Sequence, residues 1–283
     1  MVEFQLGLAL KPSMLGSSPG EKSRELIRIV GLASSIGVDT IVLDSERRVD
    51  DLSPIDVEAA VRYSEDIGGP VIIPTLPVRR SDSNSLLAGY IKVLSRRESM
   101  GICIVAGNPA YLSVEEASVR PGRLLWNACG AVEGVLNGRP MLLGTENVER
   151  VSKRICRSLG FTPFLLLDEG VEEMARGFAE YAGRGVAVYA PFFIGDGVAG
   201  GVESVLISYA RRRKRLARAL DGGGVGLSEA LKVSIVGCVE EVAGRVAGLA
   251  LTGVGLLVGF PAELSEEQFR GFALACRMGW RKD

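Results

Sequence analysis

Two carboxylates follow an apolar run and could handle a proton. Asp44 and Glu46 come directly after residues 40–43 (TIVL), which predict a buried strand. A carboxylate in this place can act as a general acid or as a hydrogen-bond acceptor. Alternatively, both residues cap the loop or pair with the neighbouring Arg47 and Arg48. The sequence leaves both interpretations open.

A glycine and an amide follow the apolar run at residues 102–106. Gly107 allows a ligand to approach the backbone closely, and the Asn108 amide can both donate and accept hydrogen bonds. These two residues are therefore our strongest candidates for ligand binding. A strand that ends in glycine and an asparagine turn would show the same residues.

A third candidate, Asp168-Glu169-Gly170, lies between a predicted strand and a predicted helix. The start of a helix attracts anions through its free N–H groups, so this loop could hold a phosphate. The alternative role for Asp168 is a helix cap.

Other chemical groups limit the reaction classes. The sequence contains no histidine, which removes the commonest general base and zinc ligand, and it has no zinc, P-loop or Rossmann signature. Lys11 follows the first predicted strand, so a barrel lyase that forms a Schiff base is one hypothesis, and a solvated loop lysine is the alternative. The basic run at residues 211–215 (RRRKR) has apolar residues at helical spacing around it and predicts a solvated helix face, not a nucleic-acid site.

Strand and helix patterns alternate along the chain. Strands are predicted at residues 4–10, 40–43, 71–74, 102–106, 164–167, 186–189 and 254–259, with a small extra strand at 141–143 and a further strand at either 204–210 or 231–236. Helices are predicted at 21–35, 86–94, 124–136, 148–159, 171–181 and 239–249, with one beginning at Pro54 that buries Ile55, Ala59 and Tyr63, and a last one capped by Ser265. Residues 191–201 predict a loop. This order predicts a TIM-like (β/α)8 barrel, shortened near the seventh strand, with residues 1–283 as a single domain.

The composition indicates a cytoplasmic globular protein. The formal net charge is -1, which gives no overall field to attract nucleic acid or anionic lipid. We expect no signal peptide, because the amino terminus leads directly into a strand pattern, and no membrane span. The five cysteines are odd in number and far apart, so we expect reduced core residues.

Three segments in order resemble the bacterial luciferase-like superfamily, which includes flavin-dependent monooxygenases and coenzyme F-420 (deazaflavin) dependent reductases such as methylenetetrahydromethanopterin reductase. The matching residues are 36–44 (IGVDTIVLD), 94–95 with 101–107 (LS and GICIVAG), and 237–242 with 253–259 (GCVEEV and GVGLLVG). Each segment alone is weakly specific, but together they span most of the chain.

The resemblance implies a barrel, often a homodimer, that holds coenzyme F-420 or FMN at the carboxyl ends of its strands and transfers a hydride to or from a small organic substrate. It places Thr75 and Leu76 against the flavin ring, in some members through a cis peptide, Gly107 and Asn108 at the cofactor, and Asp168, Glu169 and Gly170 near its phosphate. Phe192 would help to shape the pocket. Several features depart from the family pattern. Asp44-Ser45-Glu46 stands where members often have Asp-His, the turn after the fourth strand is Gly107-Asn108-Pro109 and not a two-glycine turn, and the phosphate loop carries two carboxylates.

We therefore hypothesise an oxidoreductase in which Asp44 or Glu46 handles any proton. The rival hypothesis is a catalytically degenerate family member that binds a ligand or a partner subunit. The missing imidazole and the acidic phosphate loop favour the rival.

Overall fold

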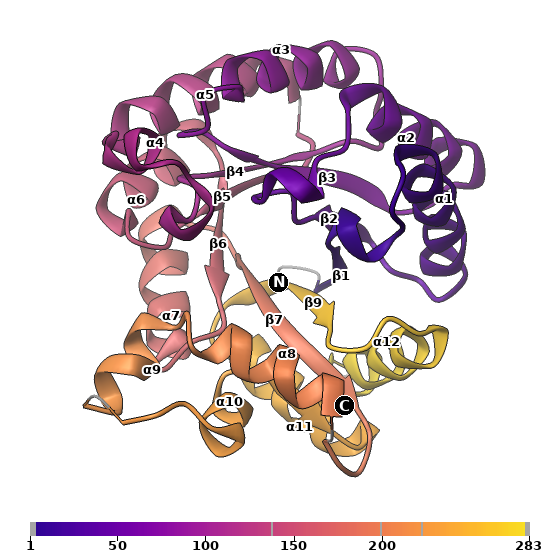
Figure 1. Cartoon of the computed structure of the whole chain (residues 1–283), viewed down its shortest axis with the longest axis vertical. Helices are drawn as coiled ribbons and strands as arrows, with labels where there is room; N and C mark the ends of the chain where they lie inside the picture. The colour runs from indigo at the N-terminus through magenta and orange to yellow at the C-terminus, as the bar shows by residue number, and fades with distance from the viewer. Residues whose placement is uncertain (1–3, 137, 199, 222, 281–283) are drawn as a thin grey trace. The chain divides into compact units, whose positions relative to one another are not determined.

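The computed structural model describes residues 4–136, 138–198, 200–221 and 223–280. In this part of the chain, nine strands form one sheet and alternate with helices (Figure 1). Eight strands close into a ring, because β1 pairs with β9 and β6 pairs with β7. Every pairing with a described register is parallel. The predicted (β/α)8 barrel is confirmed.

The elements have the following bounds. The strands are β1 (Gln5–Leu10), β2 (Thr40–Leu43), β3 (Val71–Pro77), β4 (Ile102–Val105), β5 (Met141–Gly144), β6 (Thr162–Leu166), β7 (Val186–Ile194), β8 (Ile235–Gly237) and β9 (Val254–Pro261). The α-helices are α1 (Pro19–Ser35), α2 (Pro54–Ile67), α3 (Ser83–Leu94), α4 (Val114–Ser118), α5 (Pro121–Leu136), α6 (Glu149–Leu159), α7 (Val171–Ala182), α8 (Gly200–Ala210), α9 (Lys214–Ala219), α10 (Leu227–Lys232), α11 (Val239–Ala250) and α12 (Glu266–Trp280). Short 3-10 helices are η1 (Pro12–Met14), η2 (Arg48–Asp50) and η3 (Pro109–Tyr111).

The ring is completed differently from the sequence prediction. The strand expected as a small extra at residues 141–143 is β5, a full member of the ring between β4 and β6. Residues 204–210 belong to helix α8, which buries Val202, Leu206 and Ala210 at the four-residue spacing of a helix. Residues 231–236 divide between α10 and β8, and β8 pairs with the end of β7 outside the ring.

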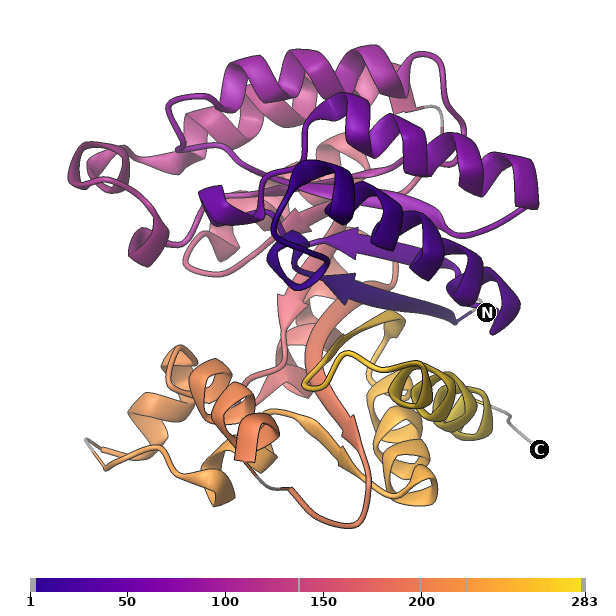
Figure 2. The same cartoon turned by 45° about the vertical axis from the view of Figure 1, so that its right-hand side comes forward.

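The described residues divide into two compact units. The amino-terminal unit comprises Ala9–Phe164 and Tyr181–Gly183, and the carboxyl-terminal unit comprises residues 4–8, 165–180 and 184–280. In the amino-terminal unit, α1, α2, α3 and α5 lie outside strands β2 to β4 (Figure 2).

Helix α2 has the predicted start but buries a different face from the one predicted. It begins at Pro54 as predicted, and the Ser53 side chain caps it by accepting a hydrogen bond from the Asp56 N–H at 3.2 Å. The predicted buried stripe was wrong, because Ile55 is 78% exposed while Val57, Ala60 and Val61 are buried. The apolar face of α2 is therefore rotated from the prediction, since several registers of a short amphipathic helix contain apolar residues.

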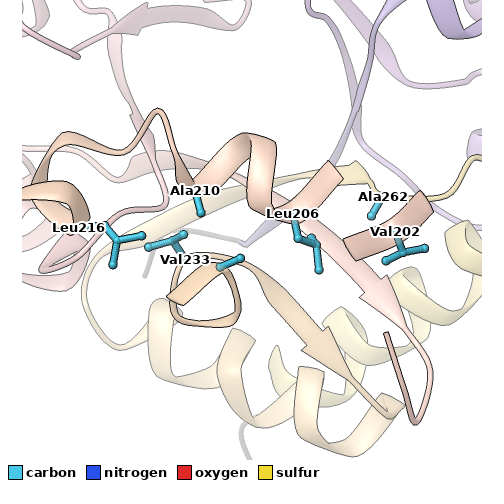
Figure 3. Packing of buried hydrophobic residues seen from close by; sticks show 7 residues of the cluster. Val202, Leu206, Ala210, Leu216, Val233 and Ala262 are labelled. Atoms are coloured by element: carbon cyan, nitrogen blue, oxygen red, sulfur yellow. The ribbon is translucent and has the colours of Figure 1, made fainter. Parts of the chain in front are cut away.

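The carboxyl-terminal unit has its own apolar cluster, built by helices α8, α9 and α10. Its buried members are Val202, Leu206, Ala210, Leu216, Ala230, Val233 and Ala262 (Figure 3). Strand β7 runs on to Ile194, so the loop expected from residue 191 begins later. Ser265 caps α12 by accepting a hydrogen bond from the Gln268 N–H at 3.3 Å, as predicted.

The five cysteines are free, and Cys103, Cys129, Cys156 and Cys276 are buried. The predicted core position is confirmed for these four cysteines, whereas Cys238 is partly exposed. A search of the described helices finds none with the length and apolar character needed to cross a membrane.

Candidate functional site

The two candidate carboxylates sit on a turn that is held firmly in place. Asp44 and Glu46 are partly exposed, while Ser45 between them is buried. The Ser45 hydroxyl lies 3.1 Å from the Leu43 carbonyl oxygen and 3.2 Å from that of Thr75. These contacts tie the end of β2 to β3, so both carboxylates start from a fixed backbone.

Thr75 lies beside Cys103 at the same end of the amino-terminal unit. The two residues are register partners on the neighbouring strands β3 and β4. Burial raises the pKa of the Cys103 thiol, and the charges of Glu46 and Asp44 raise it further. The structure therefore brings Asp44, Glu46 and Thr75 together around Cys103, a neighbour that sequence reasoning treated only as core.

Leu76 and the peptide before it differ from the expectation drawn from the resemblance. Successive strand side chains point to opposite faces, so Leu76 faces away from Thr75, and it is 1% exposed. The described residues contain no cis peptide bond.

Gly107 and Asn108 form the predicted turn. Side chains of Pro77 and Leu112 fill part of the space over Gly107. Gly107 has φ +88°, and a Cβ built there would lie 3.3 Å from Pro77 Cβ and 3.5 Å from a Leu112 methyl carbon. Asn108 Oδ1 accepts a hydrogen bond from the Ala110 N–H at 3.0 Å. Within the described residues the Asn108 amide nitrogen donates to no protein group, so it remains available to a ligand.

Arg79 closes this turn and was missed from the sequence. Its Nε donates to the Ala106 carbonyl oxygen at 2.9 Å, its Nη1 to that of Ala117 at 3.0 Å, and its Nη2 to that of Gly107. Burial lowers the pKa of Arg79, and the charge of Glu46 opposes that shift. The available signal was the pair of arginines just after the third strand.

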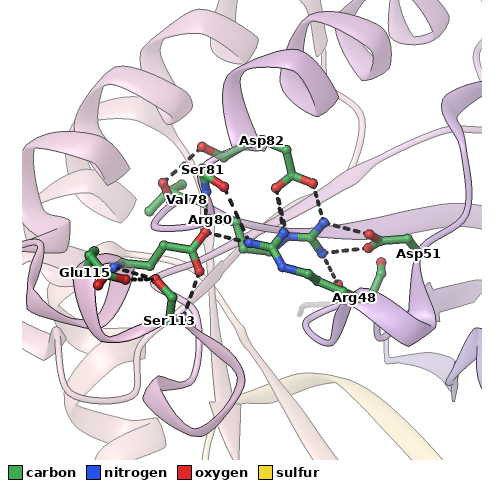
Figure 4. A network of polar contacts seen from close by, with 11 residues as sticks. Arg48, Asp51, Val78, Arg80, Ser81, Asp82, Ser113 and Glu115 are labelled. Atoms are coloured by element: carbon green, nitrogen blue, oxygen red, sulfur yellow. Dashed lines mark hydrogen bonds and ion pairs between the residues drawn. The ribbon is translucent and has the colours of Figure 1, made fainter.

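Arg80 has a structural role in the network drawn in Figure 4. It is 2% exposed, and both Asp51 and Asp82 bind its guanidinium with shortest N–O distances of 2.6 Å. Its Nη1 also reaches the Ser45 carbonyl oxygen at 3.4 Å. Hydrogen bonding to Asp51 raises the pKa of Arg80, and hydrogen bonding to Arg80 lowers the pKa of Asp82. All five guanidinium N–H groups are used, so Arg80 fastens loops and has none left for a ligand.

Glu116 fastens α4 to the same network. Its carboxylate accepts hydrogen bonds from the N–H groups of Ser113 at 3.0 Å and Ser81 at 2.7 Å, and from Arg48 at 2.6 Å. These donors, the backbone of Ser113 first, lower the pKa of Glu116 to about 2. The candidate pairing of Arg48 with Asp44 or Glu46 thus has competitors, since Arg48 binds Glu116 and Asp82.

In the carboxyl-terminal unit, the Asp168 carboxylate is hydrogen-bonded both to its own loop and to helix α9. Its Oδ1 accepts hydrogen bonds from the N–H groups of Glu169 at 2.8 Å and Leu216 at 3.0 Å, and its Oδ2 accepts from Arg215 at 3.1 Å. The carboxylate therefore caps the first turn of α9. The predicted capping role is present, but for a helix distant in sequence.

Gly170 is left facing a cation. It has φ +70°, and a Cβ built there would meet only Nη1 of Arg215, at 3.4 Å. Helix α7 begins at the next residue, Val171. The backbone of Gly170, the start of α7 and the Arg215 guanidinium thus form a small cradle, here called the Gly170 cradle, that suits an anion.

Phe192 lies in the core of the carboxyl-terminal unit. Its ring is 0% exposed and stacks on Phe272 with centroids 4.0 Å apart. A cofactor contact through this ring was expected, but the ring packs against α12 instead. Phe269 and Phe272 of α12 are buried as well, whereas Leu274 is 50% exposed, so core packing explains most of its apolar face.

Lys11 is partly exposed and precedes η1. Among residues 4–136, 138–198, 200–221 and 223–280, no group of three or more cysteine and carboxylate side chains could hold a metal ion.

The strand order and the alternating helices define the chain as a (β/α)8 barrel. Solved structures with this fold include the oxygenating constituent of 3,6-diketocamphane monooxygenase from Pseudomonas putida in complex with FMN, at TM-score 0.70 and 16% identity over 97% of each chain. An F-420-dependent secondary alcohol dehydrogenase has TM-score 0.69 and 10% identity over 99% of this chain and 100% of that one. Coenzyme F-420 dependent tetrahydromethanopterin reductase from Methanopyrus kandleri has TM-score 0.67 and 15% identity over 96% and 97%.

The sequence itself gives the family. Residues 27–268 match the model of a family of unknown function, DUF7388, and the chain belongs to that family. No curated protein matches the sequence.

Proposed function

We propose that this protein is an oxidoreductase of the luciferase-like superfamily that binds coenzyme F-420 or FMN and acts on a small organic substrate. The observation that carries the proposal is that the Asp168 carboxylate accepts hydrogen bonds from the first turn of α9, while Gly170 faces the Arg215 guanidinium. Similar folds in proteins whose names include FMN or coenzyme F-420 support it. Such a cofactor, when bound, supplies hydride transfer.

The residues of the carboxyl-terminal unit fit a phosphate. The positive φ of Gly170 leaves its backbone bare, and the Arg215 guanidinium lies close enough to share the same anion. The acidic loop at residues 168–170 was an argument against a bound cofactor in the sequence. With Arg215 beside Gly170, we propose that this loop is compatible with a cofactor phosphate. Glu169 is exposed, the Asp168 carboxylate is hydrogen-bonded to the first turn of α9, and the first turn of α7 carries Glu172 and Glu173.

The residues of the amino-terminal unit would handle protons and orient a ligand. Asp44 and Glu46 are partly exposed carboxylates, so either can exchange a proton with a substrate. Thr75 offers a hydroxyl beside them, and Asn108 offers an amide N–H to a ligand carbonyl.

The proposal is tested by titrating the purified chain with FMN and with coenzyme F-420 while following fluorescence and thermal unfolding. A ligand that binds only the native state raises apparent stability by mass action. We expect one cofactor to bind, and Arg215→Met to weaken it at least tenfold. Arg218→Met removes the same charge from an exposed position of α9 and should leave binding unchanged. Failure of both cofactors to bind would overturn the proposal.

The proton-handling role needs a separate experiment. We expect Asp44→Asn or Glu46→Gln to lower turnover by roughly a hundredfold, the low end for a general acid or base, while the cofactor Kd stays the same. If both amide variants keep full turnover, neither carboxylate handles the proton.

One observation favours the rival function, a barrel that binds a ligand without catalysis. The space over Gly107 is partly filled by Pro77 and Leu112, which narrows the approach of a ligand to that turn. The rival predicts tight cofactor binding with no substrate-dependent reoxidation or reduction of the bound cofactor. Stopped-flow absorbance with candidate substrates separates the two functions.

A further inference from the structure

Arg79 is a partly buried cation that forms no ion pair with any carboxylate of the described residues. No carboxylate oxygen of the described residues lies within the 4.0 Å of an ion pair from its guanidinium. The next residue, Arg80, is a buried guanidinium whose charge is balanced by ion pairs. Its nitrogens lie 2.6 Å from carboxylate oxygens of both Asp51 and Asp82. A cation removed from water without a partner is costly, so its retention calls for an explanation.

The backbone contacts of Arg79 do not neutralise it. The side chain donates to three carbonyl oxygens, those of Ala106, Gly107 and Ala117. These dipoles orient the guanidinium but carry no net charge. A guanidinium has five N–H donors, so two of the five remain without a protein acceptor among the described residues.

The location of Arg79 is that of a ligand-binding group. It follows β3 at the carboxyl end of the strands, where (β/α)8 barrels place their sites, and it touches the turn that carries Asn108. The free amide N–H groups of Asn108 add neutral donors on the same turn. The carboxylate that acts on Arg79 electrostatically is Glu46, which lies beyond ion-pair distance.

We propose that Arg79 binds the carboxylate or phosphate group of the substrate, so that the reaction of this protein acts on an anionic small molecule. The planar fork of a guanidinium matches two oxygens of either group. The anion would replace the missing counterion and occupy the two unused N–H donors. As a statement about the substrate, the inference rests on the proposed oxidoreductase function; as a statement about anion binding, it depends only on Arg79 and its surroundings.

Glu46 gives the proposal a signature that loss of folding cannot imitate. Its negative charge near Arg79 must oppose the approach of an anion. Glu46→Gln removes that charge and leaves the three backbone contacts of Arg79 in place. The variant should therefore bind anions more tightly than the wild type, a gain that a damaged fold would not produce.

The test is isothermal titration calorimetry of the full chain at low ionic strength, with benzoate and, separately, inorganic phosphate as probes. We expect at least one probe to bind, Arg79→Met to weaken it at least tenfold, and Glu46→Gln to tighten it severalfold. Arg79→Lys keeps the charge without the fork and should fall between Arg79→Met and the wild type. Arg96→Met is the matched control, since Arg96 is exposed and lies before β4, at the opposite end of that strand.

Each outcome decides the proposal. It is overturned if neither probe binds the wild type, if Arg79→Met binds as tightly as the wild type, or if Arg96→Met weakens binding equally. Benzoate binding alone assigns a carboxylate substrate, and phosphate binding that survives Arg215→Met but not Arg79→Met assigns a phosphate. Failure of the cofactor titrations together with Arg79-dependent anion binding would refute the oxidoreductase and keep the anion site.

Discussion

Leu216 donates its backbone N–H to Oδ1 of Asp168 at 3.0 Å, although the two residues are 48 positions apart in the sequence. A helix begins with N–H groups that have no partner within the helix, and a carboxylate satisfies them well. The contact stabilises α9 and engages the carboxylate that lies two residues before Gly170.

This contact predicts a measurable stability difference. Asp168→Ala should lower the free energy of unfolding by about 1–2 kcal/mol, the typical effect of losing a helix cap, and Asp168→Asn should lower it less because Oδ1 remains as an acceptor. Urea denaturation measures both. Glu169→Gln, at an exposed neighbour, is the control, and an equal loss in that variant would contradict the capping role.

Glu116 predicts an acid-sensitive stability. Its pKa falls from the ordinary 4.5 to about 2 in the folded chain, so the unfolded chain binds more protons between those values. The stabilisation is complete above about pH 4.5 and is lost as the pH falls towards about 2. Glu116→Gln should therefore show a shallower loss of stability in that range, measured by denaturant unfolding at several pH values. A slope equal to that of Glu133→Gln, an exposed control, would argue against it.

The thiols predict selective alkylation. Burial raises the pKa of Cys103, Cys129 and Cys276, and Cys156 is also buried, whereas Cys238 is partly exposed. Because the thiolate is the reactive form, iodoacetamide should modify Cys238 first in the native chain and all five cysteines after unfolding. Peptide mass spectrometry identifies the sites. Rapid native labelling of Cys103 would show that the end of β4 is open to reagent.

Phe192 and Gly259 predict large packing effects. Phe192→Ala should cost about 3–5 kcal/mol of unfolding free energy, as for other buried aromatic residues. Gly259→Ala should also destabilise strongly, because its Cβ would overlap the rings of Phe272 and Phe192. Leu274→Ala, at a half-exposed position of α12, should change stability by about 0.5 kcal/mol or less. If Phe192→Ala instead kept normal stability and lost only cofactor affinity, the ring would contact the cofactor and the packing role would be wrong.

The sequence by itself determined the barrel and the positions of the candidate carboxyl-end residues. Continuous apolar runs such as residues 40–43 and 102–105, each followed by a polar turn, are local patterns, and a parallel strand covered on both faces requires them. The sequence did not show that β5 belongs to the ring, because an apolar run of four residues looks the same in a ring strand and in an extra strand.

Only the tertiary structure decided which side chains are committed to the protein and which remain for a ligand. Asp168 is engaged by a helix distant in sequence, Phe192 by α12, and Arg80 by two aspartates, while Arg79 beside it has no counterion among the described residues. The adjacent arginines are the same residue type in the same loop, and no local pattern separates them. The difference arises because hydrogen bonds and ion pairs depend on distances between segments that only folding brings together.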